Sequence, residues 1–198
     1  MIELLSRLHT APVPSELGIR PRRFDLPERA SLQSSLDSLD SPWQGGPISE
    51  VARAALSDHA HEVARWLEEF DDLAQQLTTT EATQVITHGE PHPGNLIYGV
   101  EGLRLIDWDT VALSRPERDL WMLDDDSPRC FSRYEELTGT RVNDVAIRFY
   151  QLAWSLSDVA SFSAMFRGSH QETRWIRQKW SGFLRLLEGD PSAPYKTP

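Results

Sequence analysis

The chain has 198 residues, of which 39% are hydrophobic and 25% charged, and a formal net charge of −10, so a globular protein is expected. This acidity disfavours nucleic acid as a partner, and the only cysteine, Cys130, excludes an intramolecular disulfide bond and a four-cysteine zinc site. No stretch approaches the roughly 18 apolar residues that a membrane span requires, so we expect a cytoplasmic protein without a membrane partner.

The first part of the chain is predicted to be helical, with loops between the helices. Apolar residues crowd one side of a short helix over residues 2–9, which ends before Pro12. Prolines, glycines and serines from Gly18 to Pro47 predict surface loops around a short helix near Leu32. Apolar residues at helical spacing then predict one long amphipathic helix over residues 49–77.

The middle of the chain is predicted to hold short strands. Residues 83–87 are rich in β-branched side chains and lead into a segment, 88–95, that is too rich in proline and glycine to continue a strand. Residues 96–98 and 103–106 are two further strands, and the glycines of the turn between them favour a hairpin. Such a hairpin brings Asp107, just past its second strand, back beside the segment before its first.

The last part of the chain is again helical by pattern. Asn143 is a candidate N-cap for a helix whose apolar face extends to Val159, and a second apolar face runs from Ile176 to Leu187. Residues 191–198 are predicted to be a flexible tail. The residues therefore predict a mainly helical α+β fold, with helices packed around a small hairpin in the middle of the chain.

Three polar residues of the central segment suit phosphoryl transfer. Catalysis of that reaction is mostly positioning and charge neutralisation by a divalent metal ion, so carboxylates and one amide suffice. Glu90 is the candidate catalytic base that accepts the proton of a substrate hydroxyl. Asn95 and Asp107 offer the hard oxygen ligands that Mg²⁺ prefers.

Three ordered motifs carry a resemblance to a known family. The segment HGEPHPGN at 88–95 resembles the catalytic loop of the aminoglycoside phosphotransferase and choline kinase-like family, which is related to protein kinases. LIDWD at 105–109 resembles the metal-binding segment of that family, and PERDLW at 116–121 resembles its Pro-x-x-Asp-Leu stretch. The resemblance implies that residues 1–190 form the C-terminal lobe of the kinase-like fold.

The resemblance also implies an activity and several residue roles. It implies ATP-dependent (or other nucleoside triphosphate-dependent) phosphorylation of a small-molecule hydroxyl, with Mg²⁺, and cationic molecules are among the candidate substrates. Ile97 and Ile106 would form the floor under the adenine, and Asp109 would contact metal or substrate. Three residues would support the site: His88, His92 and Asp119.

Two departures from the family pattern lower the activity that we expect of the chain alone. Glu90 stands where the family more often has Asp, and the only lysines, Lys179 and Lys196, lie far from the motifs in sequence. No Gly-rich phosphate loop occurs, and residues 4–9 resemble the helix that follows the hinge between the two lobes. The N-terminal lobe is therefore expected to be absent, leaving a weak or inactive chain that self-associates through apolar surface.

Other interpretations of these motifs remain open. Glu90 and the absent lysine also suit a noncatalytic pseudokinase that only binds a ligand or partner. The alternation of His88, Glu90 and His92 suits a metal-dependent hydrolase, although the prolines between them disfavour a regular strand. The acidic run at 124–126 is interpreted as a solvated loop rather than a site for cationic substrates.

Overall fold

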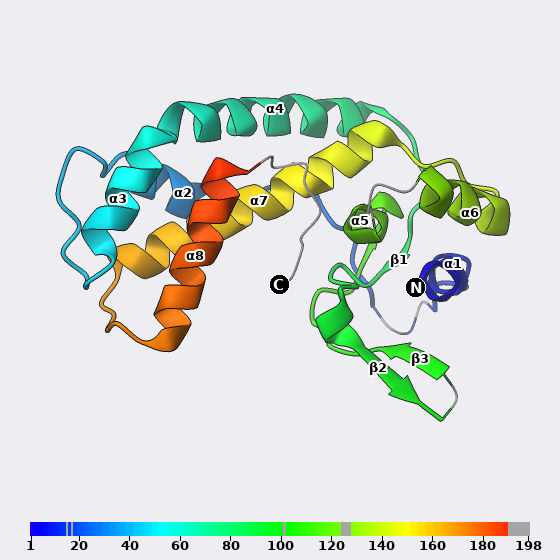
Figure 1. Ribbon diagram of the computed structural model, residues 1–198. Helices are drawn as coiled ribbons and strands as arrows, with labels where there is room; N and C mark the ends of the chain where they lie inside the picture. The colour runs from blue at the N-terminus through cyan, green and yellow to red at the C-terminus, as the bar shows by residue number, and fades with distance from the viewer. Residues whose placement is uncertain (15, 17, 101, 124–127, 190–198) are drawn as a thin grey trace. The chain divides into compact units, whose positions relative to one another are not determined.

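The computed structural model describes residues 1–14, 16, 18–100, 102–123 and 128–189 (Figure 1). The chain forms two compact units: the first contains Met1–Phe24 and Gln75–Tyr150, and the second contains Asp25–Ala74 and residues 151–189. The division falls within two long helices, α4 (Ala60–Thr79) and α7 (Asp144–Arg167). The acidic run at 124–126 and the tail predicted at 191–198 lie outside the described residues.

The first unit contains two antiparallel pairs of short strands. β1 (Val85–Thr87) pairs with β4 (Ala112–Ser114), and β2 (Leu96–Gly99) pairs with β3 (Gly102–Leu105). The predicted hairpin is thus confirmed, with Leu96 opposite Leu105. β4 was not predicted, and its other edge bonds to the segment at 20–22, because the Leu113 N–H donates to the Arg20 carbonyl at 2.9 Å.

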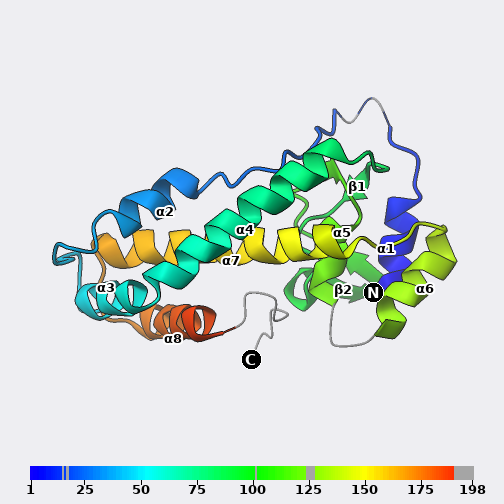
Figure 2. The same cartoon turned by 90° about the horizontal axis from the view of Figure 1, so that it is seen from above.

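Besides the ends of α4 and α7, the first unit contains helices and two 3-10 turns, one of which lies within the segment 88–95. They are α1 (Ile2–His9), α5 (Glu117–Leu120), α6 (Pro128–Thr138) and the 3-10 turns Pro93–Asn95 and Trp121–Leu123. α1 packs against α6 and β1, and both views show α1 and α6 side by side (Figures 1 and 2). Leu5, Ser6 and His9 of α1 are buried, so one apolar and two polar side chains of this helix face the interior.

The second unit is entirely helical in its described part. It holds α2 (Arg29–Leu36), α3 (Ser49–Asp58), α8 (Arg174–Glu188), most of α4 and the C-terminal two thirds of α7. α3 packs against α8, as Figure 2 shows. The Thr173 hydroxyl caps α8 by accepting from the Ile176 N–H at 3.2 Å. The core is aromatic, with Phe166 in ring contact with Phe162, Trp180 and Phe183.

The prediction of one helix over 49–77 is wrong, because the chain breaks at His59 between α3 and α4. His59 has φ −109° and ψ 6°, and its N–H turns back to the Leu56 carbonyl at 3.2 Å. The preceding Ser57 and Asp58 are poor helix formers whose side chains compete for backbone groups. The periodicity of apolar residues alone does not predict a break of one residue in a helix.

The other helical predictions agree with the structure. Asn143 caps α7, because its Oδ1 accepts from the Ala146 N–H at 3.2 Å. The mainly helical α+β fold with a small hairpin is confirmed. None of the helices within the described ranges is both long enough and apolar enough to span a membrane.

Candidate active site

The loop at 88–95 leaves β1 and enters β2 through a 3-10 turn. The His92 N–H donates to the Glu90 carbonyl at 2.8 Å, and the Asn95 N–H donates to the His92 carbonyl at 2.9 Å. The His92 ring caps the turn by accepting from the Gly94 N–H on Nδ1 at 3.0 Å. The second half of the loop is therefore held by its own hydrogen bonds, as Pro93 at the start of the turn favours.

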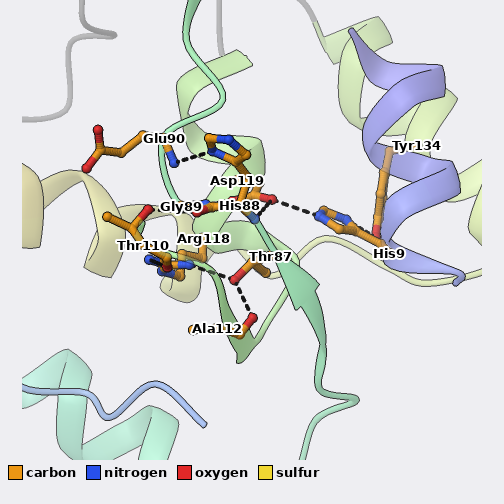
Figure 3. A network of polar contacts seen from close by, with 10 residues as sticks. All are labelled: His9, Thr87, His88, Gly89, Glu90, Thr110, Ala112, Arg118, Asp119 and Tyr134. Carbon is orange, nitrogen blue, oxygen red and sulfur yellow. Dashed lines mark hydrogen bonds and ion pairs between the residues drawn. The ribbon is translucent and has the colours of Figure 1, made fainter. Parts of the chain in front are cut away.

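Asp119, the third residue of α5, holds the first half of the loop. Its carboxylate is 0% exposed, and its two oxygens accept from the His88 N–H at 2.8 Å and the Gly89 N–H at 2.6 Å (Figure 3). Hydrogen bonds to an ionised acceptor are shorter and stronger than neutral ones. The carboxylate therefore ties the start of the loop to α5, which is the geometry that the predicted supporting role of Asp119 requires.

The His88 side chain connects the loop to the end of the hairpin. Its Nδ1 accepts from the Glu90 N–H at 3.2 Å, and its Nε2 lies 2.9 Å from the Ile106 carbonyl oxygen. Since a carbonyl can only accept, Nε2 carries the proton and the ring is neutral. The His88 ring also packs edge-on against Trp108, with ring centroids 4.7 Å apart.

These contacts argue against a metal site formed by His88, Glu90 and His92. Both ring nitrogens of His88 are engaged, so His88 has no free lone pair for a metal ion. Across the described ranges, no group of three or more His, Cys, Asp or Glu side chains could hold a metal. The alternative site built from His88, Glu90 and His92 is therefore not formed.

Asn95 and Asp107 lie at the same end of the hairpin. The Ile106 N–H donates to the Asn95 carbonyl at 3.0 Å, which extends the β2–β3 ladder by one step beyond Leu96 and Leu105. Asp107 is the next residue, and its side chain is exposed. Hairpin register thus juxtaposes the two predicted magnesium ligands.

The Asn95 side chain is hydrogen-bonded through its nitrogen, and Asp107 has an unusual backbone conformation. The Asn95 Nδ2 donates to the Glu90 carbonyl at 3.0 Å, so Oδ1 points the other way. Asp107 has φ +64° and is the only non-glycine residue with positive φ in the part of the chain that the structure describes. Aspartate tolerates this conformation better than most residues, and such backbone angles concentrate at functional sites.

The Glu90 carboxylate is free to meet a substrate. The residue is half-buried, and within the described part of the chain its carboxylate accepts no hydrogen bond. Figure 3 shows the Glu90 side chain extending away from Asp119, while its backbone N–H points to the His88 ring. The backbone of Glu90 is therefore anchored while its side chain remains available.

Arg118 forms a second clamp that the sequence did not predict. Its Nη1 donates to the Thr87 hydroxyl at 2.8 Å and its Nη2 donates to the Thr110 carbonyl at 2.7 Å (Figure 3). The Thr110 hydroxyl in turn donates to the His88 carbonyl at 2.7 Å. Burial lowers the pKa of the Arg118 guanidinium, although the neighbouring Asp119 opposes this effect. Adjacency to Asp119 in sequence was the only signal.

Gly89 lies under this guanidinium. It has φ +96°, and a Cβ at this position would come within 2.2 Å of the Arg118 Nη2. The loop therefore requires glycine here both for its backbone angle and for space.

Two other residues in the network, His9 and Tyr134, were also missed. His9 lies 110 positions before Asp119 in sequence, yet its Nε2 is 3.1 Å from that carboxylate. No spacing rule relates residues so far apart, so only the tertiary structure could reveal them.

The remaining predicted residues are exposed. Ile97, in β2, is 45% exposed and Ile106, after β3, is 38% exposed, which is unusual for isoleucine. Asp109 is exposed in the turn that precedes β4. Two apolar side chains at the hairpin suit a planar base, but their role and that of Asp109 stay predictions.

Comparison with known proteins identifies relatives of this chain. The model of the phosphotransferase enzyme family matches residues 1–154. Protein StrN of Streptomyces griseus is 33% identical over 102 residues, which cover 52% of this chain and 29% of that protein.

Solved structures of the same class share the fold. The complex of spectinomycin phosphotransferase, APH(9)-Ia, with ADP and spectinomycin matches 94% of this chain and 62% of its own, with a TM-score of 0.76 at 17% identity. A choline/ethanolamine kinase family protein from Mesorhizobium loti matches 95% of this chain and 61% of its own, with a TM-score of 0.50 at 17% identity. At these identities the likeness shows a kinase-like fold, and the chain spans less than two thirds of each relative.

Proposed function

The chain belongs to the phosphotransferase enzyme family, and from this premise we propose that it carries the catalytic residues of an ATP-dependent kinase for a small-molecule hydroxyl. One observation carries the proposal: an anchored loop presents Glu90 and Asn95, and hairpin register sets Asp107 at the same end as Asn95. These are the base and the two metal ligands that phosphoryl transfer needs. His88, His92 and Asp119 support the loop through the hydrogen bonds described above.

Glu90 acts as the catalytic base in this proposal. Its carboxylate has no hydrogen-bond partner among the described residues, so it can accept the proton of the attacking hydroxyl. As that oxygen bonds to the terminal phosphorus of ATP, the bond to the bridging oxygen breaks and ADP leaves. A general base of this kind typically contributes about 10²-fold to 10⁴-fold in rate.

Asn95 and Asp107 fit a magnesium ion. The Asn95 Nδ2 is engaged with the Glu90 carbonyl, which leaves Oδ1 as the candidate ligand, and Asp107 is exposed one position past Ile106, the ladder partner of Asn95. Two protein oxygens are enough, since Mg²⁺ usually keeps waters and substrate phosphates as its other ligands. Bound Mg²⁺ would neutralise charge on the phosphates. Asp109 is the candidate for a further contact with metal or substrate.

Ile97 and Ile106 form the proposed contact with the nucleotide base. Their exposed side chains offer apolar surface next to the metal ligands. Spectinomycin phosphotransferase was solved with ADP and with AMP, and APH(2")-IIia with GDP, which supports a nucleoside triphosphate without choosing its base. The need for ATP and the single Cys130 both favour the cytoplasm as the place of action.

The substrate is proposed to be a small, cationic alcohol. The net charge of −10 suits a cation, and the related structures contain spectinomycin in one case and kanamycin in another. Lys179 lies in α8 with its ammonium over the Phe162 and Trp175 rings, and both lysines, Lys179 and Lys196, lie far from the loop in sequence. We therefore expect the 198-residue chain alone to transfer phosphate slowly or not at all.

The test combines nucleotide binding with phosphoryl transfer. Binding of ATP is measured by calorimetry with Mg²⁺ and with EDTA, and transfer from labelled ATP is measured against a panel of amino alcohols and aminoglycosides. Both are done for this chain and for any longer form that the upstream genomic sequence encodes. Binding should need Mg²⁺ and should be lost in Asp107→Asn. Glu90→Gln should lower transfer by about 10²-fold or more but leave binding intact.

The control is Asp58→Asn, an exposed carboxylate at the end of α3, which should change neither quantity. Absence of Mg²⁺-dependent ATP binding both in this chain and in any longer form would contradict the proposal.

A noncatalytic binding module is the rival function, favoured by Glu90 and by the distance in sequence of both lysines, Lys179 and Lys196, from the motifs. Such a module predicts that ATP binding persists, that no form transfers phosphate, and that Glu90→Asp and Glu90→Ala behave like the wild type. A rise in transfer for Glu90→Asp together with a loss for Glu90→Ala would instead identify the carboxylate as part of an enzyme.

A further inference from the structure

The buried Asp119 carboxylate has a third partner, which comes from the other end of the chain. His9 is the last residue of α1, and its Nε2 lies 3.1 Å from the same Oδ2 that accepts from the His88 N–H. Its Nδ1 lies 2.9 Å from the hydroxyl oxygen of Tyr134 in α6. Figure 3 shows Asp119 between the loop backbone and the His9 ring.

The protons in this chain of contacts can be assigned. An ionised carboxylate only accepts, so the His9 Nε2 donates to Asp119. Burial raises the pKa of the Tyr134 hydroxyl, so Tyr134 keeps its proton. In a neutral His9 ring the Tyr134 O–H therefore donates to Nδ1, and Tyr134 selects the tautomer that serves Asp119. The two rings also meet edge-on, with centroids 5.6 Å apart.

The third partner constrains the plane of the carboxylate. Each oxygen accepts one hydrogen bond from the loop, and these two donors are neighbours in sequence, so they alone leave the Asp119 side chain free to tilt with the loop. The His9 donor comes from a separate helix that is buried against α6 and β1. Tilting of the carboxylate would thus break the bond to His9.

We propose that His9 is a positioning residue, which holds the Asp119 carboxylate so that the loop presents Glu90 at one fixed place. The inference rests on the proposed function for its effect on rate, while its effect on the loop stands apart from any activity. The backbones of Asn95 and Asp107 are also held by the hairpin ladder, so nucleotide affinity should depend on His9 less than turnover does.

The experiment compares His9→Gln with His9→Asn. The side-chain amide nitrogen of Gln falls near the place of the His Nε2 and can donate to Asp119, whereas that of Asn falls near Nδ1 and cannot. Amide hydrogen exchange at His88 and Gly89 is followed by NMR in the 198-residue chain. His9→Asn should speed exchange at both amides by on the order of tenfold or more, and His9→Gln should stay close to the wild type.

His61→Leu, an exposed histidine of α4 in the second unit, is the matched control and should have no effect. In a form of the protein that transfers phosphate, His9→Asn should lower kcat by about tenfold to a hundredfold with little change in KM for ATP, since an error of about 1 Å has that cost.

The outcomes separate this inference from the proposed function. Equal exchange at His88 and Gly89 in the Gln and Asn variants would overturn the positioning role, whether or not transfer is detected. Faster exchange in His9→Asn but not in His9→Gln would support the positioning role, whether or not phosphate is transferred. Absence of phosphate transfer in every form of the protein would count only against the kinase proposal. An equal fall in kcat in His9→Gln and His9→Asn would also overturn the positioning role, because the loss would then not depend on a donor to Asp119 at the place of the His9 Nε2.

Discussion

At the scale of single residues, Gly89 combines a positive φ with a close side-chain neighbour, Arg118. Gly89→Ala must adopt φ near +96° and displace the Arg118 guanidinium, whereas Gly102→Ala meets φ near +104° with nothing within 4 Å. We expect Gly102→Ala to lower the free energy of unfolding by about 1 kcal/mol, from backbone strain alone. Gly89→Ala should cost about 3 kcal/mol, because overpacking against the half-buried, hydrogen-bonded guanidinium of Arg118 adds to that strain. Urea denaturation measures both, and equal losses would show that Arg118 moves aside freely.

Glu117 makes stability depend on pH in an unusual direction. Its buried carboxyl accepts from the Asn143 N–H at 2.8 Å, and burial raises its pKa although that hydrogen bond opposes the shift. The native state therefore holds this proton to a higher pH than the unfolded chain, whose glutamate pKa is about 4.3. The free energy of unfolding contributed by Glu117 falls as pH rises through this window.

Glu117→Gln should remove this fall, because the amide oxygen can still accept from Asn143 but carries no charge. Relative to the wild type, the variant should gain stability as the pH rises above about 4.3 in urea unfolding experiments. Glu50→Gln is the control with opposite sign, since the hydrogen bond from Arg53 lowers the pKa of Glu50. A wild-type-like pH dependence in Glu117→Gln would contradict the prediction.

At the scale of secondary-structure elements, the N-caps of the long helices are the testable features. Asn143→Ala should destabilise the protein by about 1 kcal/mol, because the Ala146 N–H at the start of α7 loses its acceptor. Asn143→Asp keeps an acceptor oxygen and should be nearly neutral. Thermal unfolding of the two variants provides the comparison, with Thr173→Ala as an equivalent cap deletion on α8. Equal losses for Asn143→Ala and Asn143→Asp would argue against capping as the cause.

The β2–β3 hairpin is the element that brings Asn95 and Asp107, which are 12 positions apart in sequence, to the same end of a strand pair. The turn pairs Gly99 with Gly102. The same register, followed along the two strands, sets Asn95 opposite Ile106, and Asp107 is the residue after Ile106. A shift by one residue would reverse the facing of every side chain on the strand. The register could be anticipated because the glycines mark the turn and both strands are short.

At the scale of the whole molecule, the apolar side chains of the hairpin predict self-association of the chain alone. Tyr98 is 88% exposed and Ile97 is 45% exposed on β2, and Val100 beside them is also exposed. Ile97 and Tyr98 are neighbours in a strand and face opposite sides of the hairpin, and a second copy of this chain is the occupant that we expect for this exposed apolar region. Sedimentation velocity should show concentration-dependent association that Tyr98→Thr combined with Ile97→Thr reduces. Trp175→Thr, which removes a 54% exposed side chain of α8, should leave the association unchanged. Monomer at all concentrations would contradict the prediction.

Membership of the phosphotransferase enzyme family, the mainly helical fold and the central hairpin were all predictable from the sequence. They depend on contiguous motifs, helical periodicity and turn glycines, which are local properties of the chain. Local patterns failed where a single residue interrupts a regular element, as at His59, and where a strand is only three residues long, as in β4.

The tertiary structure decided how the candidate catalytic loop is held. Asp119 was expected to brace the loop, but its partner His9 lies 110 residues away and the Tyr134 that orients His9 lies 125 residues from it. Contacts over such separations arise because a buried carboxylate must be satisfied by whichever donors the packed helices bring to it, and no spacing in the sequence records that choice. The sequence alone therefore predicted which residues would act, and only the folded chain revealed the residues that contact and hold the loop.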